Sequence, residues 1–292
     1  MRFGLVGTGP WATIAHGPGL LAAEGVELVG VWGRHATRAS ELAGRLGVAG
    51  YDDYGALLED VDAVAFAVPP AVQAPMAVQA AAIGKHLLLD KPVALTAEDA
   101  REVVAEAEAE GVASVVFFTD RFTPESRSWF AAAAATGGWR GGWVRMIAAL
   151  DTPGNPFAES PWRRERGALW DIGPHALSNL TAVLGPVVSL TAVAGAGDLV
   201  HLVVTHESGA TSTASLSLFA PPAGANAELG LWGDSGTTVR PDSATPAAQS
   251  LAIAASELVA AAESGIPHPV DAAFGARVVE LLADAESQLR TT

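Results

Sequence analysis

The first residues of the chain, Arg2-Phe3-Gly4-Leu5-Val6-Gly7-Thr8-Gly9-Pro10-Trp11-Ala12, predict its fold. A short apolar strand over 2–6 runs directly into the pattern Gly-x-Gly-x-x-Ala, which in this position is typical of a dinucleotide-binding βαβ unit. Gly7 permits the tight turn, Gly9 lets the backbone approach a pyrophosphate, and Ala12 keeps the next helix close to the strand. The N-terminus of that helix then faces the phosphates. We therefore expect the six residues Gly7 to Ala12 to bind the cofactor.

Strands and helices alternate regularly after this motif. Strands are expected over 26–32, 62–68, 86–89 and 112–118, and helices over 37–46, 71–83 and 96–110. Strands that alternate with helices of this length indicate βαβ units and a doubly wound parallel sheet, hence the α/β class. We expect residues 1–118 to form an NAD(P)-binding Rossmann domain. Pro69, at the end of the 62–68 strand, is expected to line the cofactor site.

The end of the second strand bears on the choice of cofactor. An acidic residue there would bind the ribose 2′-hydroxyl of NAD, whereas an arginine accommodates the 2′-phosphate of NADP. The chain has Gly33-Arg34 at this point, with Arg38 one turn further on and no acid. A planar guanidinium can pair with a phosphate and stack on adenine. We therefore expect NADP(H) to be preferred and NAD(H) to be possible. The alternative is that Arg34 is only a solvated loop residue.

The stretch His86-Leu87-Leu88-Leu89-Asp90-Lys91-Pro92-Val93 places two charges at the end of a buried strand. In an open α/β sheet the carboxyl ends of the strands form the edge at which ligands bind. Lysine is rarely buried without a partner, so Lys91 requires an explanation. One explanation is a role in the site. The other is an ordinary surface ion pair with Asp90, or with Glu98 in the next helix.

The pattern changes in the second half of the chain. Strands are expected over 143–150, 187–194, 199–206, 210–219 and 227–232, with helices at the alanine run 131–135 and over 246–264 and 270–289. Consecutive strands with short turns suggest a C-terminal α+β domain, residues 119–292, built on a large open and mostly antiparallel sheet. The two closing helices cannot easily cover so much sheet. We therefore expect a homodimer or homotetramer packed through it.

The segment Gly167-Ala168-Leu169-Trp170-Asp171-Ile172-Gly173-Pro174-His175-Ala176 carries titratable groups. Asp171 and His175 are four residues apart, which on one helix places them on the same face. Pro174 is tolerated only where a helix has just begun, so both side chains are expected near a helix N-terminus.

Together these motifs resemble the glucose–fructose oxidoreductase / inositol dehydrogenase / MocA family. The matching segments are Gly7 to Ala12, Gly84 to Pro92 and Gly167 to His175, and His268-Pro269-Val270-Asp271 fits a C-terminal signature of that family. The resemblance spans essentially the whole chain. It implies a Rossmann domain followed by an α/β domain whose open sheet often mediates oligomerisation. By this likeness Lys91, Asp171 and His175 match the catalytic positions of the family.

The chain departs from the family pattern at three positions. Asp90 stands where glutamate is usual, Gln73 where histidine is common after the double proline, and Ser178 where aspartate is frequent. The shorter Asp90 side chain is expected to move the carboxylate's hydrogen bonds. The changes at 73 and 178 could alter the cofactor or substrate pocket.

The resemblance implies hydride transfer between a nicotinamide and a carbon that bears a hydroxyl or carbonyl group, in a sugar, inositol or related polyol. His175 is the candidate general acid/base, because its unperturbed pKa is near neutrality. Lys91 would stabilise a developing alkoxide, and Asp171 would orient His175 or bind a substrate hydroxyl. Which of Lys91 and His175 moves the proton stays open.

Two aromatic residues and a basic cluster bear on the substrate. Trp162 and Trp170 could offer apolar faces to a sugar ring, although most tryptophans lie in cores. The cluster Trp162-Arg163-Arg164-Glu165-Arg166 would suit a substrate carboxylate or phosphate if it faces the pocket. The alternative is a solvated loop with no bearing on specificity.

Composition narrows the class of protein. The chain has 292 residues, a formal net charge of −15 and no cysteine. Such an acidic chain repels nucleic acid and anionic membranes, and it has neither cysteine ligands nor spaced histidines for a metal. With no leader or apolar span expected, we place it in the cytoplasm. The rival functions are a non-catalytic NADPH-binding regulator and a reductase of imines or tetrapyrroles. A metal hydrolase is the weakest alternative.

Overall fold

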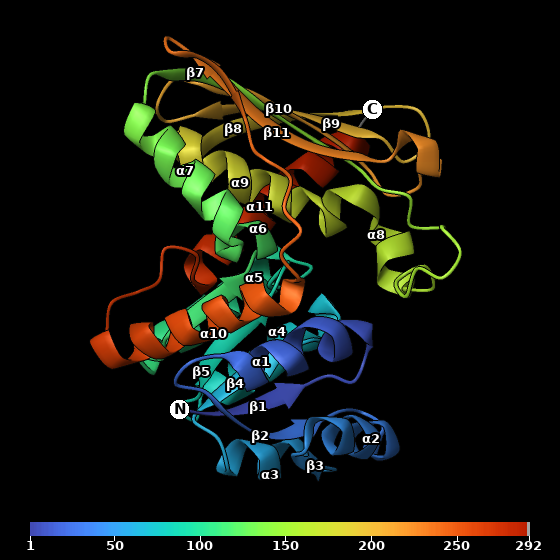
Figure 1. Ribbon diagram of the computed structural model, residues 1–292, viewed down its shortest axis with the longest axis vertical. Coiled ribbons are helices and arrows are strands. Elements are labelled where there is room, and N and C mark those ends of the chain that lie inside the picture. Colours follow the sequence, from blue (N-terminus) through green and yellow to red (C-terminus); the bar gives the residue numbers. More distant parts are fainter. Residues whose placement is uncertain (291–292) are drawn as a thin grey trace. The chain divides into compact units, whose positions relative to one another are not determined.

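The computed structural model describes residues 1–290, and these fold into two compact units (Figure 1). The first unit consists of residues 1–123 together with 244–279. The second consists of residues 124–243 together with residues 280–290. The segment 244–279 follows the second unit in sequence but belongs to the first. The assignment of cofactor and substrate roles to residues 1–118 and 119–292 stays a prediction.

The first unit is built on a parallel sheet with the strand order β3-β2-β1-β4-β5-β6. Its strands are β1 (Arg2–Val6), β2 (Glu27–Trp32), β3 (Ala49–Tyr51), β4 (Ala63–Phe66), β5 (His86–Asp90) and β6 (Ser114–Phe117). The strands β4 and β6 are buried at every residue, as expected of strands covered on both faces. The order reverses direction between β1 and β4, so the predicted doubly wound topology is confirmed. The three-residue strand β3 was not predicted.

Helices connect these strands and cover the sheet. They are η1 (Ala12–His16), α1 (Gly17–Ala22), α2 (Ala36–Leu46), α3 (Tyr54–Glu59), α4 (Pro70–Ala81), α5 (Ala97–Ala109), α6 (Thr119–Phe122) and α10 (Ala247–Ser264). Helix α10 packs against α1 and against strands β5 and β6. The approach of α1 and α10 depends on Gly19, because a Cβ there would lie 2.7 Å from the Ala248 carbonyl oxygen. The expectation that both closing helices belong to the second sheet is therefore wrong for α10, whose apolar face covers the parallel sheet.

The second unit contains a mixed sheet with the order β12-β11-β7-β10-β9-β8. Its strands are β7 (Trp139–Ile147), β8 (Val187–Ala194), β9 (Val200–His206), β10 (Thr211–Ser217), β11 (Asn226–Gly233) and β12 (Gly236–Val239). Neighbouring strands are antiparallel, with the exception of the parallel pair β7 and β10. The predicted open and mostly antiparallel sheet is confirmed, with one parallel pair added.

One face of this sheet carries the helices of the second unit (Figure 1). They are α7 (Pro124–Thr136), α8 (Pro161–Asp171), α9 (Gly173–Leu184) and the later part of α11 (Ala272–Arg290), and a short turn η2 (Pro222–Gly224) lies before β11. Helix α9 packs on β7 and β10, and Gln288 of α11 hydrogen-bonds the backbone of β8. The apolar side chains Val193, Val203 and Trp232 are 53%, 50% and 48% exposed. The helices therefore leave apolar side chains of this sheet open to solvent.

Candidate functional site

The glycine-rich loop after β1 is tight at one glycine and open at the other. Gly7 has φ +131°, and a Cβ at this position would overlap the carbonyl group of Ala67 after β4. Its N–H donates to the Trp32 carbonyl at 2.8 Å. At Gly9, by contrast, an added Cβ would meet no atom within 4 Å. The loop therefore packs closely against the sheet and leaves its outer backbone accessible, which fits a bound pyrophosphate.

The helix that follows the loop begins with a π-helical turn, η1, rather than the regular α-helix expected. Ala12 is fully buried, as predicted for the small residue that brings helix and strand together. Trp11 at the N-cap makes no side-chain hydrogen bond to the first amides, and its ring stacks on Phe117 with centroids 6.3 Å apart. The Thr13 N–H donates to the Gly9 carbonyl at 3.1 Å. A helix start without a capping side chain suits an anion such as a phosphate.

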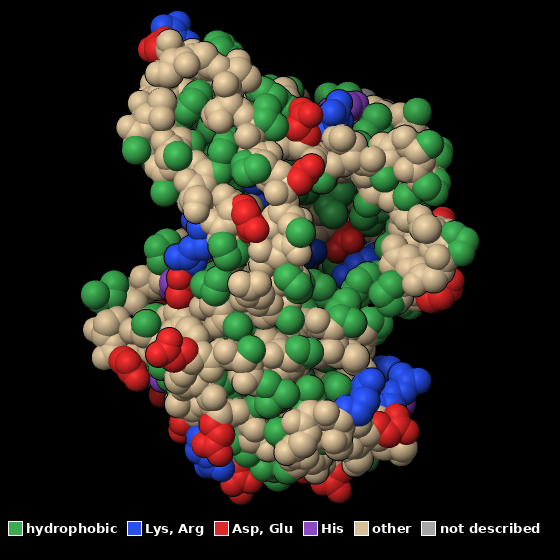
Figure 2. Space-filling model, viewed as in Figure 1, with side chains coloured by type: hydrophobic (Ala, Val, Ile, Leu, Met, Phe, Trp, Pro, Cys, Tyr) green, Lys and Arg blue, Asp and Glu red, His purple; other side chains and the backbone are tan. Residues whose placement is uncertain are grey.

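The residues expected to bind the adenosine half lie at the neighbouring strand ends. Gly33 directly follows β2, and a Cβ there would lie 2.5 Å from Thr8 Cγ2, so the two loops are in close contact. Arg34 and Arg38 are exposed, and Figure 2 shows Lys and Arg side chains gathered near α2. Pro69 follows β4 and is also exposed. All these residues stand at the carboxyl edge of the parallel sheet, the edge at which such folds bind ligands.

Lys91 stands in a turn at the end of β5 that a single buried side chain holds. The Gln73 amide nitrogen, on α4, donates to the carbonyl oxygens of Asp90 at 2.8 Å, Val93 at 3.0 Å and Pro92 at 3.3 Å. The Gln73 amide oxygen accepts the Asp90 N–H at 2.8 Å. Gln73 is completely buried. The departure from histidine at this position thus leaves a side chain that fixes the backbone on both sides of Lys91.

The Asp90 carboxylate lies between this turn and a buried histidine. Its Oδ1 accepts the Lys91 N–H at 2.8 Å, and its Oδ2 lies 3.9 Å from Nε2 of His16 on η1. His16 is fully buried, and neither ring nitrogen has a hydrogen-bond partner within residues 1–290. Burial lowers the pKa of His16 to about 3, so the ring is neutral at physiological pH. Sequence reasoning did not single out His16.

Asp171 and His175 lie at a junction of two helices, so the prediction that one helix carries both was wrong. Asp171 is the last residue of α8, and His175 is in the first turn of α9. Pro174 occupies that first turn, as expected, because its missing N–H is tolerated there. Asp171 is buried and His175 is half-buried. Both residues therefore lie near the N-terminus of α9, as predicted, but the helix is interrupted between them at Ile172.

The basic cluster 162–166 is neither a solvated loop nor a free anion site, because it forms the first turns of α8 and its arginines are paired. Arg163 Nε donates to Asp171 Oδ2 at 3.1 Å. Arg164 contacts Asp151 at 2.6 Å, and Arg166 contacts Glu286 at 3.3 Å. A substrate anion would have to share these guanidinium groups with carboxylates that already contact them.

The two tryptophans of α8 have different surroundings. Trp170 is only 1% exposed, and its indole N–H donates to Glu286 Oε1 at 3.1 Å. It is therefore a core residue and cannot present a face to a sugar ring, contrary to one expectation. Trp162 is half-buried, and its ring lies 4.8 Å from the Arg163 guanidinium. Ser178 is completely buried on α9.

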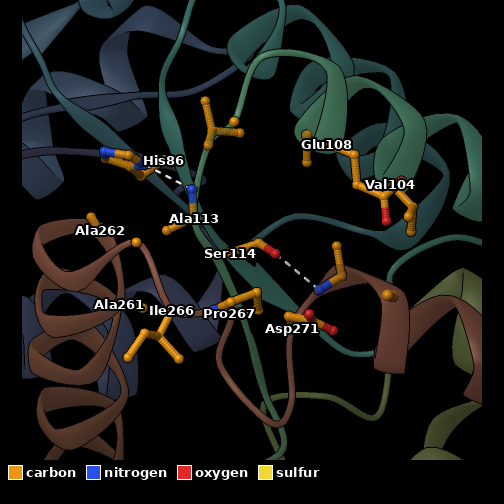
Figure 3. Close-up of a pocket in the computed structure, with 16 residues that line it drawn as sticks. His86, Val104, Glu108, Ala113, Ser114, Ala261, Ala262, Ile266, Pro267 and Asp271 are labelled. Carbon is orange, nitrogen blue, oxygen red and sulfur yellow. Dashed lines mark hydrogen bonds between the residues drawn. The ribbon is translucent and has the colours of Figure 1, made fainter.

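A cavity of about 250 Å³ lies in the first unit, but at the opposite end of the strands (Figure 3). His86 and Ser114, which begin β5 and β6, line it together with Glu108 and Asp271. The Ala113 N–H donates to His86 Nδ1 at 2.9 Å, and the Ala272 N–H donates to Ser114 Oγ at 2.9 Å. Burial lowers the pKa of His86. Because the cavity opens at the amino ends of the strands, it is separate from the ligand edge that carries Lys91.

The signature His268-Pro269-Val270-Asp271 has a structural role in the first unit. The Val116 N–H donates to the Val270 carbonyl at 2.8 Å, and the Asp271 carboxylate accepts the Phe274 N–H at 2.9 Å. The first contact attaches the segment before α11 to strand β6, and the second lies within the first turn of α11. Within residues 1–290 no cluster of histidine and acidic side chains has the arrangement of a metal site. None of the described helices is long and apolar enough to span a membrane.

Comparisons with known proteins agree with this geometry. The family model described as "Oxidoreductase family, NAD-binding Rossmann fold" matches residues 1–118, and the model "GFO/IDH/MocA C-terminal domain" matches residues 140–239. The chain is 29% identical over 190 residues to a dTDP-3,4-didehydro-2,6-dideoxy-alpha-D-glucose 3-reductase of Streptomyces antibioticus, a match that covers 64% of this chain and 57% of the relative. It is 34% identical over 127 residues to a D-xylose 1-dehydrogenase (NADP(+)) of Haloferax volcanii, covering 42% and 39%.

Similarity at the level of the fold extends over the full length. A levoglucosan dehydrogenase solved with NADH and levoglucosan superposes with a TM-score of 0.87 at 18% identity, covering 100% of this chain and 97% of that one. At this identity the likeness establishes the fold alone. The matches to the curated relatives cover between 32% and 57% of their lengths.

Proposed function

We propose, from the premise that this chain belongs to the GFO/IDH/MocA oxidoreductase family, that it is an NAD(P)-dependent dehydrogenase or reductase. It transfers a hydride between a nicotinamide and the hydroxyl-bearing or carbonyl carbon of a sugar, inositol or related polyol, and it prefers NADP(H). The observation that carries the proposal is the anchored turn at the end of β5. Four hydrogen bonds from buried Gln73 hold the backbone around Lys91 at the ligand edge of a dinucleotide-binding sheet.

The cofactor would be held by the loop from Gly7 to Ala12 and by the neighbouring strand ends. The outer backbone at Gly9 and the start of the helix that follows it would contact the pyrophosphate. Arg34 and Arg38 would pair with the 2′-phosphate of NADP(H), since an exposed guanidinium at this strand end matches a phosphate. The relative named as NADP(+)-dependent supports this choice. When bound, the cofactor supplies or accepts the hydride, which is the redox part of the reaction.

The protein's own side chains would stabilise the charge that develops on the substrate and transfer one proton. The Lys91 ammonium would polarise the substrate oxygen and stabilise negative charge that develops on it. The His175 imidazole would donate or accept the proton of the hydroxyl group, because its ordinary pKa is near neutrality. Asp171 would orient His175 or bind an adjacent substrate hydroxyl.

The substrate is proposed to be uncharged at the end that meets α8. Arg163, Arg164 and Arg166 each have a carboxylate partner within the second unit. A carboxylate or phosphate on the substrate would compete with those pairs and gain little. Neutral sugars and polyols, which bind through hydroxyl groups, fit this arrangement better.

A cofactor-fluorescence screen tests the proposal. NADP⁺, NADPH, NAD⁺ and NADH are each offered with myo-inositol, D-glucose, D-xylose, their oxidised counterparts and the matching sugar acids. We expect turnover with at least one neutral member and tighter binding of NADP(H) than of NAD(H) by calorimetry. Binding of NADPH without turnover of any compound in the screen would favour a regulatory protein. Absence of binding of all four cofactors would exclude both the oxidoreductase and the NADPH-binding regulator.

We also propose that the protein is a cytoplasmic homodimer or homotetramer that packs through the open face of the second sheet. Val203, in the middle of strand β9, is half exposed, and so are Val193 and Trp232. Apolar side chains on an uncovered sheet are typical of a contact surface. Light scattering at micromolar concentration should give at least a dimer mass, and Val203→Lys should reduce it to the monomer mass. A monomeric wild type would contradict the assignment.

A further inference from the structure

Arg163 has an environment unlike that of the other two arginines of α8. Its Nε donates to Asp171 Oδ2 at 3.1 Å, and its Nη1 donates to Ser160 Oγ at 3.3 Å. The guanidinium lies over the rings of Phe157 and Trp162, with a distance of 4.8 Å to each centroid. Only 19% of the side chain is exposed. Two aromatic faces and two hydrogen bonds therefore fix this cation in one place.

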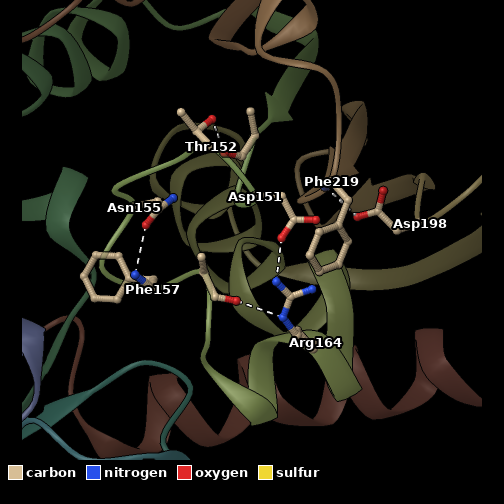
Figure 4. A network of polar contacts seen from close by, with 9 residues as sticks. Asp151, Thr152, Asn155, Phe157, Arg164, Asp198 and Phe219 are labelled. Carbon is tan, nitrogen blue, oxygen red and sulfur yellow. Dashed lines mark hydrogen bonds and ion pairs between the residues drawn. The ribbon is translucent and has the colours of Figure 1, made fainter.

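The neighbouring Arg164 provides the contrast (Figure 4). It pairs with Asp151 at 2.6 Å and donates to the Ala158 carbonyl at 2.8 Å, so it also anchors the loop 151–160. However, its side chain is 44% exposed and that of Asp151 is 58% exposed. Figure 4 shows its guanidinium between Asp151 and Phe219, and the guanidinium carbon lies 5.6 Å from the centroid of the Phe219 ring. Exposed pairs of this kind contribute little to stability.

The partner of Arg163 is Asp171, a carboxylate that is largely shielded from solvent. The Asp171 side chain is 10% exposed, and a buried carboxylate is costly unless it is paired and hydrogen-bonded. A guanidinium supplies a charge-assisted bond in a fixed plane. The contact is possible because Gly167, with φ +66° and ψ −165°, breaks the helix between the two residues. In a straight helix, residues eight apart would be about 12 Å apart along the axis.

We propose that Arg163 is a positioning residue, which fixes the Asp171 carboxylate at the α8–α9 junction and ties it to the loop 151–160 through Phe157 and Ser160. This inference rests on the proposed function, in which Asp171 acts on His175 or on a substrate hydroxyl. The contacts of Arg163 are with Asp171, Ser160 and the two aromatic rings, so its proposed action is through the carboxylate. Its guanidinium sets where the carboxylate points, and the loop conformation determines where the guanidinium lies.

The first test needs no substrate. Hydrogen exchange followed by mass spectrometry compares wild type with Arg163→Met, which removes the charge and keeps much of the side-chain volume, and with Arg164→Met as the matched control. We expect Arg163→Met to lose protection both in 151–160 and in 168–176. Arg164→Met should lose it in 151–160 alone. Unchanged protection at 168–176 in Arg163→Met would overturn the proposal.

The second test uses the panel sugar or polyol that the wild type turns over fastest. Arg163→Met should lower kcat on the order of 10- to 100-fold with little change in KM, since misplacing a catalytic group costs about this much. Arg164→Met should stay near wild type. When Asp171→Asn is already present, adding Arg163→Met should change kcat very little, because the guanidinium acts through the Asp171 carboxylate. Full additivity of the two changes would overturn the proposal.

Two further variants guard against misfolding. Arg163→Lys keeps the charge but loses the planar stacking, and we expect it to retain an intermediate kcat. Arg163→Ala should regain part of its kcat in millimolar guanidinium chloride, while Arg164→Ala should show no such gain. If both variants are folded, but Arg163→Lys retains no kcat above that of Arg163→Met and guanidinium chloride does not raise the kcat of Arg163→Ala, positioning by the guanidinium is contradicted. If no panel member is turned over at all, the proposed function fails, while the exchange experiment still decides the contact.

Discussion

The turn that carries Lys91 and the junction that carries Asp171 are each held by one side chain from elsewhere in the same unit, but by different chemistry. Gln73 is neutral and completely buried, and it satisfies four backbone groups of the turn. Arg163 is charged and partly exposed, and it binds one carboxylate between two aromatic rings. The first arrangement fixes a main-chain geometry, whereas the second fixes a side chain and its charge.

This difference teaches what each group is required to do. Lys91 must project a long flexible side chain from a defined point, so rigidity is useful in its backbone. Asp171 has a short side chain, so its position is set by the helix junction, and its ionised state needs a cation. We therefore expect changes at the two anchors to be distinguishable by what they alter, namely stability at Gln73 and turnover at Arg163.

The largest expected effect comes from removing the groups that the anchors serve. Lys91→Ala and His175→Ala should each lower the single-turnover rate of hydride transfer by about 10²–10³-fold, because each removes charge or proton management in the transition state. Cofactor affinity should change far less, and the double variant should be little worse than either single one. Lysine occurs in the chain only at 85 and 91. Lys85→Ala, just before the other end of β5, is the control. Near-wild-type rates for Lys91→Ala would contradict the catalytic role and favour the alternative, in which Lys91 forms an ordinary surface ion pair.

The next effect breaks the neutral anchor. Gln73→Leu leaves buried N–H and C=O groups of the turn without partners, which should lower the free energy of unfolding by about 2–4 kcal/mol. Gln73→His, the residue common in the family pattern, should cost less because a ring nitrogen can keep one of the bonds. Gln79, exposed on the same helix, provides the control Gln79→Leu. Urea denaturation that gives equal stabilities for the variants at 73 and 79 would show that the turn does not depend on Gln73.

A third effect is a pH dependence of stability that comes from His16, the buried histidine beside the turn that carries Lys91. Because burial lowers the pKa of His16 to about 3, the unfolded chain binds a proton below pH 6.5 that the folded chain does not. The free energy of unfolding should therefore fall as the pH falls, by about 2 kcal/mol between pH 6.5 and pH 5. His16→Gln should remove this part of the pH dependence, and His35→Gln, at an exposed histidine, should not. Parallel stability curves for wild type and His16→Gln would contradict the argument.

The smallest expected effect is on cofactor affinity, and it concerns Arg34, an exposed cation at the carboxyl edge of the parallel sheet. Arg34→Asp should lower the affinity for NADP(H) relative to NAD(H) by at least about tenfold, since a hydrogen bond to a charged group contributes about 1.5–3 kcal/mol. Calorimetric titration with all four cofactors measures the ratio. Arg101→Asp, an exposed change on α5, is the control. Tighter binding of NAD(H) by the wild type would overturn the cofactor assignment.

Local sequence signals predicted the parallel sheet well, because each motif occupies consecutive residues. The run from Arg2 to Ala12 gives a strand, a turn and a helix start without any distant contact. Strands β3 and β12 escaped prediction since they are only three and four residues long and largely exposed. Helix α8 escaped because its start is a run of charged residues and Gly167 interrupts its periodicity.

The residues proposed as reacting groups stand out in the sequence, whereas the side chains that support them do not. Lys91 follows a buried strand, and Asp171 and His175 accompany a helix-starting proline, so all three stand out in sequence. Gln73 lies 17 residues before Asp90 in the chain, and its role depends on the packing of α4 against the end of β5. The sequence marked Gln73 only as a departure from the histidine of the family pattern, and one of two glutamines in a mostly apolar helix. The pairing of Arg163 with Asp171 depends on a helix break that no periodicity reveals.

The return of the chain to the first unit has a practical consequence for dissecting the protein genetically. Neither unit is a continuous stretch of sequence, because α10 belongs to the first and follows every strand of the second. A gene fragment that stops at residue 118 or 123 would encode the whole parallel sheet but omit the helix that covers α1, β5 and β6. We expect such a fragment to precipitate on expression. A cofactor-binding module would require residues 1–123 fused through a short linker to residues 244–279.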